Sequence, residues 1–267
     1  MPTREVEVRD AHAFYRRTME LLNHAGLQYL VGGGFALSHY TGIRRDTKDF
    51  DIFVLRTDYD AIMAVLESAG YDTELTFPHW LGKARCKQGY VDVIFNSGNG
   101  VSYVDDAWFQ HAEIGTVFGM PARLCPVEET IWSKAFIMER ERFDGADVMH
   151  LILSRAEQID WARLVRRFSS HWRVLFSHLC LFGFIYPSER ARIPEWVMSG
   201  LLEKLKQELL IPAPVGQTCQ GTLLSREQYL TDVQRWGLKD ARNGSGSSMT
   251  AADVALWTEA IERSHKS

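Results

Sequence analysis

Apolar residues in the first seventy positions occur partly at helical spacing and partly in short continuous runs. Phe14, Leu21 and Leu22 recur at helical spacing, with Asp10 placed to cap the helix and Gly26 to end it. Short apolar runs such as the one before Gly32 are typical of buried strands. The pattern predicts a helix from Asp10 to Gly26, strands over 28–31 and 50–55, a short helix reaching Tyr40, and a helix from Thr57 to Gly70.

The pattern changes at two places further along the chain. Up to Cys125, short alternating runs are typical of antiparallel strands and hairpins, and beyond Pro126 nearly every segment has helical spacing. We therefore expect an α+β protein. Residues 1–125 form a small mixed β-sheet flanked by helices, and residues 126–267 form an all-helical domain that completes the substrate cleft. The hairpin breaks are predicted at Gly82, 88–89 and 119–121, and the helices at 127–141, 146–155, 161–168, 172–184, 195–210, 225–236 and 251–264.

Two segments of the helical half lack this periodicity. Residues 211–216 contain two prolines and are predicted to form a loop, and residues 243–248, rich in Gly and Ser, a flexible linker. Thr250 and Asp253 follow the linker with the spacing of a capping box. The last helix is therefore expected to begin there.

Composition and charge narrow the classes of protein to be considered. The chain has 267 residues, of which 46% are hydrophobic, enough to bury a sizeable core. Its formal net charge is −4, so no overall basic field attracts nucleic acid. The four cysteines lack the spacing of a zinc site, which favours buried thiols in a reducing compartment.

The chain has no segment that predicts export or membrane insertion. The N-terminus is charged and lacks the apolar stretch of a signal peptide. The most apolar run, 174–186, is shorter than the ~20 residues that span a bilayer. We therefore expect a cytoplasmic protein without a membrane partner.

Three aspartates stand out in otherwise apolar strands. Side chains alternate along a strand, so Asp49 and Asp51 share one face while Phe50 points to the other. Asp92 lies in the same way between Val91 and Val93. Neighbouring carboxylates repel one another unless a cation lies between them, and Mg²⁺ prefers such oxygen ligands. The alternative is that all three are surface acids, although Asp is disfavoured in strands.

Three glycines lie between the predicted strand and the short helix. Gly32, Gly33 and Gly34 let backbone N–H groups approach a phosphate closely, and the N-terminus of a helix favours an anion. The alternative is a tight turn without a ligand. Together, the glycines and the later acids predict a site for a metal ion and a phosphate.

These motifs resemble the DNA polymerase β-like nucleotidyltransferase superfamily. Its pattern of an apolar residue, two small residues and a later acid-apolar-acid strand is matched by Val31-Gly-Gly-Gly and by Asp49-Phe-Asp. The resemblance implies that Asp49, Asp51 and Asp92 are catalytic metal ligands. It implies Mg²⁺, or Mn²⁺ in its place, as the cofactor and a nucleoside triphosphate such as ATP as the donor substrate.

Two branches of this superfamily share further sequence motifs with the chain. Gly32-Gly-Gly-Phe-Ala-Leu and Gly119-Met-Pro-Ala-Arg resemble aminoglycoside and lincosamide nucleotidyltransferases. The segment from Lys134 to Asp147 resembles AbiEii-type nucleotidyltransferases, the toxins of abortive-infection systems, although its spacing is shorter. The second resemblance implies RNA or protein as the acceptor and leaves an antitoxin open as a partner. The first implies an antibiotic-like small molecule, and a non-catalytic nucleotide-binding module is the third hypothesis.

Several cations are candidates for contacts with the triphosphate. Lys134 and Arg45 are expected nucleotide-binding residues, but Lys134 also has the position of a surface lysine that borders an apolar helix face. The alternative for Arg45 is that it only balances the negative charge of the nearby aspartates. A basic cluster in the helical half is expected to form a solvated helix face, with RNA phosphates as the alternative ligand. Its members are Arg163, Arg166, Arg167 and Arg173.

Overall fold

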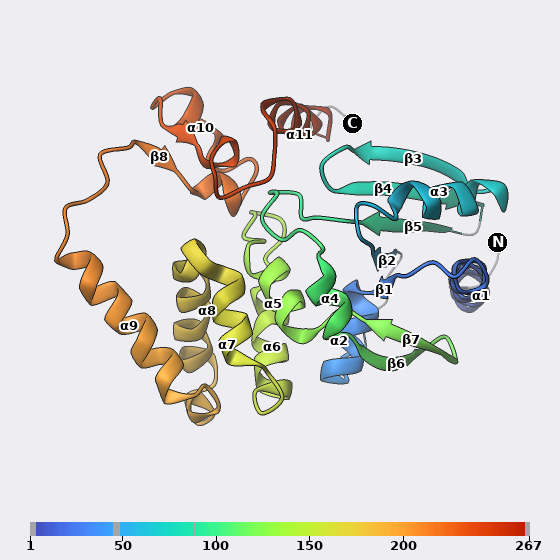
Figure 1. Ribbon diagram of the computed structural model, residues 1–267, viewed down its shortest axis with the longest axis horizontal. Helices are drawn as coiled ribbons and strands as arrows, with labels where there is room; N and C mark the ends of the chain where they lie inside the picture. Colours follow the sequence, from blue (N-terminus) through green and yellow to red (C-terminus); the bar gives the residue numbers. More distant parts are fainter. Residues whose placement is uncertain (1–3, 45–48, 88, 265–267) are drawn as a thin grey trace. The chain divides into compact units, whose positions relative to one another are not determined.

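The chain folds into two compact units, Met1–Pro126 and Val127–Ser267. The structure is a computed structural model that describes residues 4–44, 49–87 and 89–264 (Figure 1). The first unit contains a mixed β-sheet with helices, and the second is mainly helical. The predicted α+β class is therefore confirmed.

A seven-stranded sheet forms the centre of the first unit (Figure 1). Its strands lie in the order β3-β4-β5-β2-β1-β7-β6. The pairs β2·β5 and β1·β7 are parallel and the other neighbours are antiparallel. The strands are β1 (Leu30–Val31), β2 (Phe50–Phe53), β3 (Asp72–Phe77), β4 (Leu81–Cys86), β5 (Gly89–Ile94), β6 (Glu113–Val117) and β7 (Met120–Leu124).

Two helices cover one face of β3, β4 and β5. Gly89 lacks a side chain where the ring of Phe14 packs, and Gly82 lacks one where Tyr59 packs. Phe14 belongs to α1 (Arg4–His24) and Tyr59 to α3 (Tyr59–Ser68). The apolar side chains of the central strands therefore point toward α1 and α3, and their polar neighbours point away. Two further helices complete this unit, α2 (Gly33–Thr41) after β1 and α4 (Asp106–Gln110) before β6.

Three local predictions in this unit were wrong. The first helix begins at Arg4 instead of Asp10, because the intervening residues contain no Gly or Pro to prevent it. Gly82 lies inside β4, where the close approach of Tyr59 leaves no room for a side chain. The last hairpin turns at Phe118 and Gly119, whose φ angles are both positive, and the next two residues already belong to β7.

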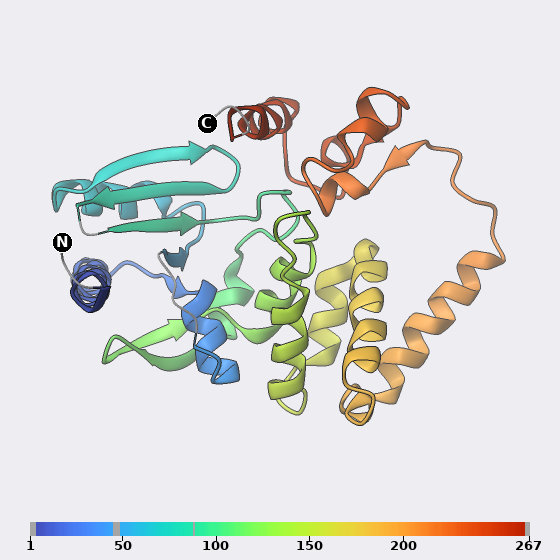
Figure 2. The same ribbon diagram turned by 180° about the vertical axis from the view of Figure 1, so that it is seen from behind.

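The second unit is built on four helices that pack against one another (Figures 1 and 2). Their buried faces are predominantly apolar, as helical spacing predicts. The four are α5 (Val127–Ala135), α6 (Gly145–Arg155), α7 (Trp161–Phe168) and α8 (Trp172–Ile185), and α9 (Glu195–Leu209) packs against α8. Among the described residues, no helix has both the length and the apolar character that crossing a bilayer requires.

The C-terminal part of this unit consists of short elements followed by one longer helix. Thr218–Cys219 (β8) pairs in parallel with Lys239–Asp240 (β9). The predicted helix over 225–236 is reduced to α10 (Leu230–Gln234). The capping box is confirmed at α11 (Ala251–Ser264), where Thr250 and Asp253 exchange backbone and side-chain hydrogen bonds. In the described part of this unit there are four short 3₁₀ turns, η1 (Ser169–His171), η2 (Arg190–Arg192), η3 (Gly221–Leu223) and η4 (Ala241–Asn243), and η3 packs against η4.

Candidate active site

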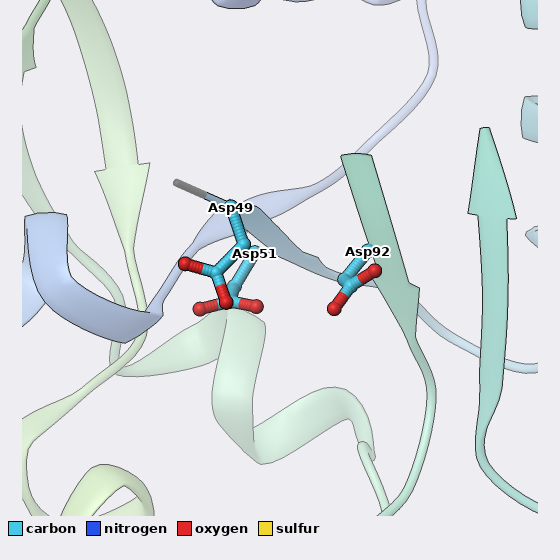
Figure 3. Close-up of side chains that lie close together, drawn as sticks. All are labelled: Asp49, Asp51 and Asp92. Atoms are coloured by element: carbon cyan, nitrogen blue, oxygen red, sulfur yellow. The ribbon is translucent and has the colours of Figure 1, made fainter. Parts of the chain in front are cut away.

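Three carboxylates converge on adjacent strands of the first unit. Asp51 on β2 lies directly opposite Asp92 on β5 in the parallel register, and Asp49 immediately precedes β2 on the same face. One oxygen from each side chain lies within 4.8 Å of the others (Figure 3). In the described part of the chain this is the only group of three or more potential metal ligands.

The apolar partners in these strands explain the direction of the carboxylates. Phe50 and Ile52 of β2, and Val91 and Val93 of β5, are completely buried. Burial of these four side chains stabilises the fold by about 1.5–3 kcal/mol each. Since alternate residues point to opposite faces, the same burial directs the acids away from the core.

Gly33 brings the beginning of α2 against Asp51. Its φ is +53°, and a Cβ atom at this position would lie 1.8 Å from Oδ2 of Asp51. Gly32 precedes the helix and has the ring of Phe53 where a side chain would be. Gly34 is the second residue of α2. The first N–H groups of a helix lack partners within the helix, so this end favours an anion close to the carboxylates.

A fourth charged residue, Lys83, contacts Asp92 and was not predicted from the sequence. It lies on β4 directly opposite Asp92, so Lys83, Asp92 and Asp51 form one row across three strands. Its Nζ atom lies 2.6 Å from Oδ1 of Asp92. The alternation of Leu81, Lys83 and Arg85 along the strand is the signal that places a lysine on this face.

Burial and the negative charge of the carboxylates raise the pKa values of Asp92 and of two nearby tyrosines. Burial raises the pKa of Asp92, and Asp49 adds to the effect, while the hydrogen bond and charge of Lys83 act against it. Burial and then the charge of Asp49 raise the pKa of Tyr15 to about 12, and the same two causes raise the pKa of Tyr90. Both phenols are therefore neutral at physiological pH.

The residues fit a hard divalent cation. All three ligands are carboxylates, the donors that Mg²⁺ and Mn²⁺ prefer. An ion bound at about 2.1 Å from two oxygens holds them up to about 4 Å apart, and two ions bridge somewhat longer separations. The spacing of the oxygens is therefore compatible with one or two ions held by Asp49, Asp51 and Asp92.

Of the two cations predicted to bind the nucleotide, only Lys134 lies in the described part of the chain. Arg45 lies outside the described residues. Lys134 lies on α5 in the second unit, where its ammonium donates to Oδ2 of Asp144 at 2.7 Å and to Oδ2 of Asp147 at 2.8 Å. Arg142 also pairs with Asp144. A contact between Lys134 and the triphosphate stays a prediction.

We expect Lys134→Met to destabilise the protein by about 3 kcal/mol, because it leaves two buried carboxylates without this cation. Burial alone raises the pKa of Asp144, but the hydrogen bond from Arg142 and the charge of Lys134 lower it below its ordinary value. This carboxylate therefore stabilises the fold at neutral pH and loses that contribution as the pH falls below about 4. Urea unfolding at pH 7, with Lys206→Met as the exposed control, measures the difference. An equal midpoint for both variants contradicts the expectation.

The basic cluster predicted to be a solvated helix face is divided, with Arg163 and Arg167 largely buried and Arg166 and Arg173 exposed. Arg163 is buried and pairs with Glu128 and Glu129 of α5, and Arg167 donates to Glu129 at 2.9 Å. The prediction was therefore wrong for Arg163 and Arg167, because a sequence gives the spacing of the arginines but not the carboxylates that pack opposite them. These two side chains connect α7 to α5.

The comparisons with known proteins concern the fold. The chain is similar to the solution structure of the antibiotic-resistance factor ANT(2'')-Ia, with 16% identity and a TM-score of 0.45 over 63% of this chain and 94% of that one. It is similar to lincomycin-bound lincosamide antibiotic adenylyltransferase LnuA, with 18% identity and a TM-score of 0.38 over 52% and 94%. A third similar structure is an antigenic nucleotidyltransferase-like protein from Paracoccidioides brasiliensis, with 14% identity and a TM-score of 0.45 over 69% and 92%. No protein-family model and no curated protein matches the chain in sequence.

Proposed function

We propose that the chain is a nucleotidyltransferase that moves a nucleoside monophosphate from a nucleoside triphosphate to an acceptor hydroxyl. One observation carries the proposal. Asp49, Asp51 and Asp92 converge on one face of β2 and β5, and the start of α2 lies against Asp51. Reaction of a triphosphate requires ligands for divalent cations and a site that binds the phosphate groups. The carboxylates fit the first requirement and the N-terminus of α2 fits the second.

Each part of the site would have a separate role in such a transfer. The three aspartates would hold Mg²⁺ or Mn²⁺, which would supply positive charge to neutralise the triphosphate. The N-terminus of α2 orients a phosphate group through its backbone N–H groups. The acceptor oxygen forms a bond to the α-phosphorus, the bond to the β-phosphate oxygen breaks, and pyrophosphate leaves with the electron pair. Asp92 binds a second ion or accepts the proton of the acceptor hydroxyl.

The acceptor belongs to one of the classes considered from the sequence. The described residues around the carboxylates include cations that are themselves paired with acids, such as Lys83 with Asp92 and Arg85 with Glu74. Apart from the three carboxylates themselves, these pairs add neither the basic surface that RNA favours nor the further acids that a cationic antibiotic favours. RNA or protein as the acceptor and an antibiotic-like small molecule therefore remain alternative forms of the proposal, and transfer of label decides between them.

We expect the wild-type protein to bind a nucleoside triphosphate only in the presence of Mg²⁺ or Mn²⁺. Calorimetric titration of each of the four nucleotides measures binding and its dependence on the metal. The same nucleotides labelled at the α-phosphate are then incubated with total RNA, cell protein and an aminoglycoside and lincosamide panel. Transfer of label to one of these three classes identifies the acceptor.

The matched variants have the same change of charge at different places. Asp49→Asn/Asp51→Asn removes two charges from the site, and Asp60→Asn/Asp72→Asn removes two exposed charges elsewhere in the unit. The first variant should lose metal-dependent binding and transfer, and the second should keep both. Equal binding by the two variants, or no metal-dependent binding by folded wild-type protein, refutes the proposed function.

A further inference from the structure

We propose that Lys83 is a positioning residue that holds Asp92 in the orientation needed by the carboxylate site. The inference rests on the proposed function, because it assigns a role toward that reaction. Lys83 lies outside the sequence motifs that predicted the site. It is identified only by the pairing of β4 with β5.

The contact is specific to one oxygen of Asp92. Nζ of Lys83 donates to Oδ1 at 2.6 Å, and no hydrogen bond from the described residues reaches Oδ2. Lys83 lies directly across the antiparallel pair from Asp92, so its side chain extends along the same face of the sheet. Lys83 therefore restrains Oδ1 and leaves Oδ2 available for the ions or the proton that the reaction requires.

The lysine is itself held in place. Its ammonium lies 4.7 Å from the centre of the Tyr90 ring, a cation–π distance, and Tyr90 belongs to the same strand as Asp92. The side chains of Lys83 and Asp92 are only 22% and 14% exposed. A partly buried ion pair of this kind restricts the rotamers of both partners more than an exposed pair does.

The charge of Lys83 also matters before any cation binds. Asp49, Asp51 and Asp92 carry three negative charges within a small volume, and the ammonium offsets one of them. The remaining formal charge of about −2 would be balanced by one divalent cation. Lys83 thus reduces the repulsion that otherwise forces Asp92 away from the other two acids.

Replacement of Lys83 should therefore change metal binding and turnover in opposite directions. In Lys83→Met, a positive charge that contacts one of the three carboxylates is removed, so nucleotide-free protein should bind Mn²⁺ roughly tenfold more tightly. Because Asp92 loses its orientation, kcat should fall by about 10- to 100-fold while KM for the nucleotide stays near the wild-type value. Lys83→Arg keeps the cation and should restore most of kcat. Mn²⁺ binding is measured by electron paramagnetic resonance and turnover by pyrophosphate release.

Arg85→Met is the matched control. Arg85 lies two residues further along β4 on the same face, but it pairs with Glu74. This variant should change Mn²⁺ affinity and kcat much less than Lys83→Met does. The inference is refuted if Lys83→Met keeps a normal kcat, which makes Lys83 only a counter-charge. It is also refuted if KM rises with kcat unchanged, which makes Lys83 a phosphate ligand.

The Mn²⁺ measurement separates this inference from the proposed function. Wild-type protein that binds no Mn²⁺, or binds it independently of Asp49 and Asp51, contradicts the proposed function as well. If wild-type binding depends on these aspartates but Lys83→Met and wild type are the same in affinity and turnover, only the role of Lys83 is refuted.

Discussion

Asp51→Asn should reduce nucleotidyl transfer by about 10³-fold while leaving the fold intact. Asp51 is the central carboxylate, since it lies opposite Asp92 on one side and against Gly33 on the other. An amide of the same shape keeps these contacts but loses the charge that holds a cation. Loss of about 4 kcal/mol of charge stabilisation in the transition state corresponds to this factor. Initial rates with saturating nucleotide and Mg²⁺ measure the effect.

Thermal unfolding provides the control for this variant. In metal-free buffer its midpoint should stay within about 3 °C of wild type, because the loss of one like charge relieves repulsion. Mn²⁺ should raise the midpoint of wild type and have a smaller effect on the variant, since only binding to the folded state stabilises it. A variant that is unfolded in metal-free buffer shows instead that Asp51 has a structural role. The catalytic assignment of this residue is then withdrawn.

Gly33→Ala should lower turnover by about 10²-fold, the second largest effect that we expect. The added Cβ would lie 1.8 Å from Oδ2 of Asp51, so the start of α2 or the carboxylate has to move by an ångström or more. A displacement of this size in a reacting group costs on the order of 10²-fold in rate. The positive φ adds a cost in stability of about 1–2 kcal/mol. Steady-state kinetics and urea unfolding measure the two effects separately.

Gly42→Ala is the control for the backbone strain. Gly42 ends the same helix with a φ of +71°, and a Cβ there meets no atom within 4 Å. Both substitutions therefore impose a similar strain, but only the one at Gly33 disturbs Asp51. Gly42→Ala should lose stability and retain turnover. Similar turnover in the two variants indicates that the contact between Gly33 and Asp51 has no part in the reaction.

Local patterns of the chain determined much of the candidate site. Alternation along 50–55 places Asp49 and Asp51 on one face because the intervening Phe50 must be buried. The same argument applies to Asp92 between two valines. The glycines between a strand and a helix, and the capping box at Thr250, are also local, because they depend on neighbours within a few residues. Short-range geometry is encoded in the sequence without knowledge of the rest of the fold.

Only the tertiary structure decided how these local features combine. The parallel register that places Asp51 opposite Asp92 joins strands some forty residues apart, and a slip by one residue would point one acid into the core. Lys83 contacts Asp92 because β4 pairs with β5, and Arg163 contacts Glu129 because α7 packs against α5. Such contacts depend on which surfaces pack together, and packing is the sum of many weak interactions over the whole unit. The sequence alone therefore predicted the acids and the fold class, whereas the lysine that pairs with one of those acids was found only in the folded chain.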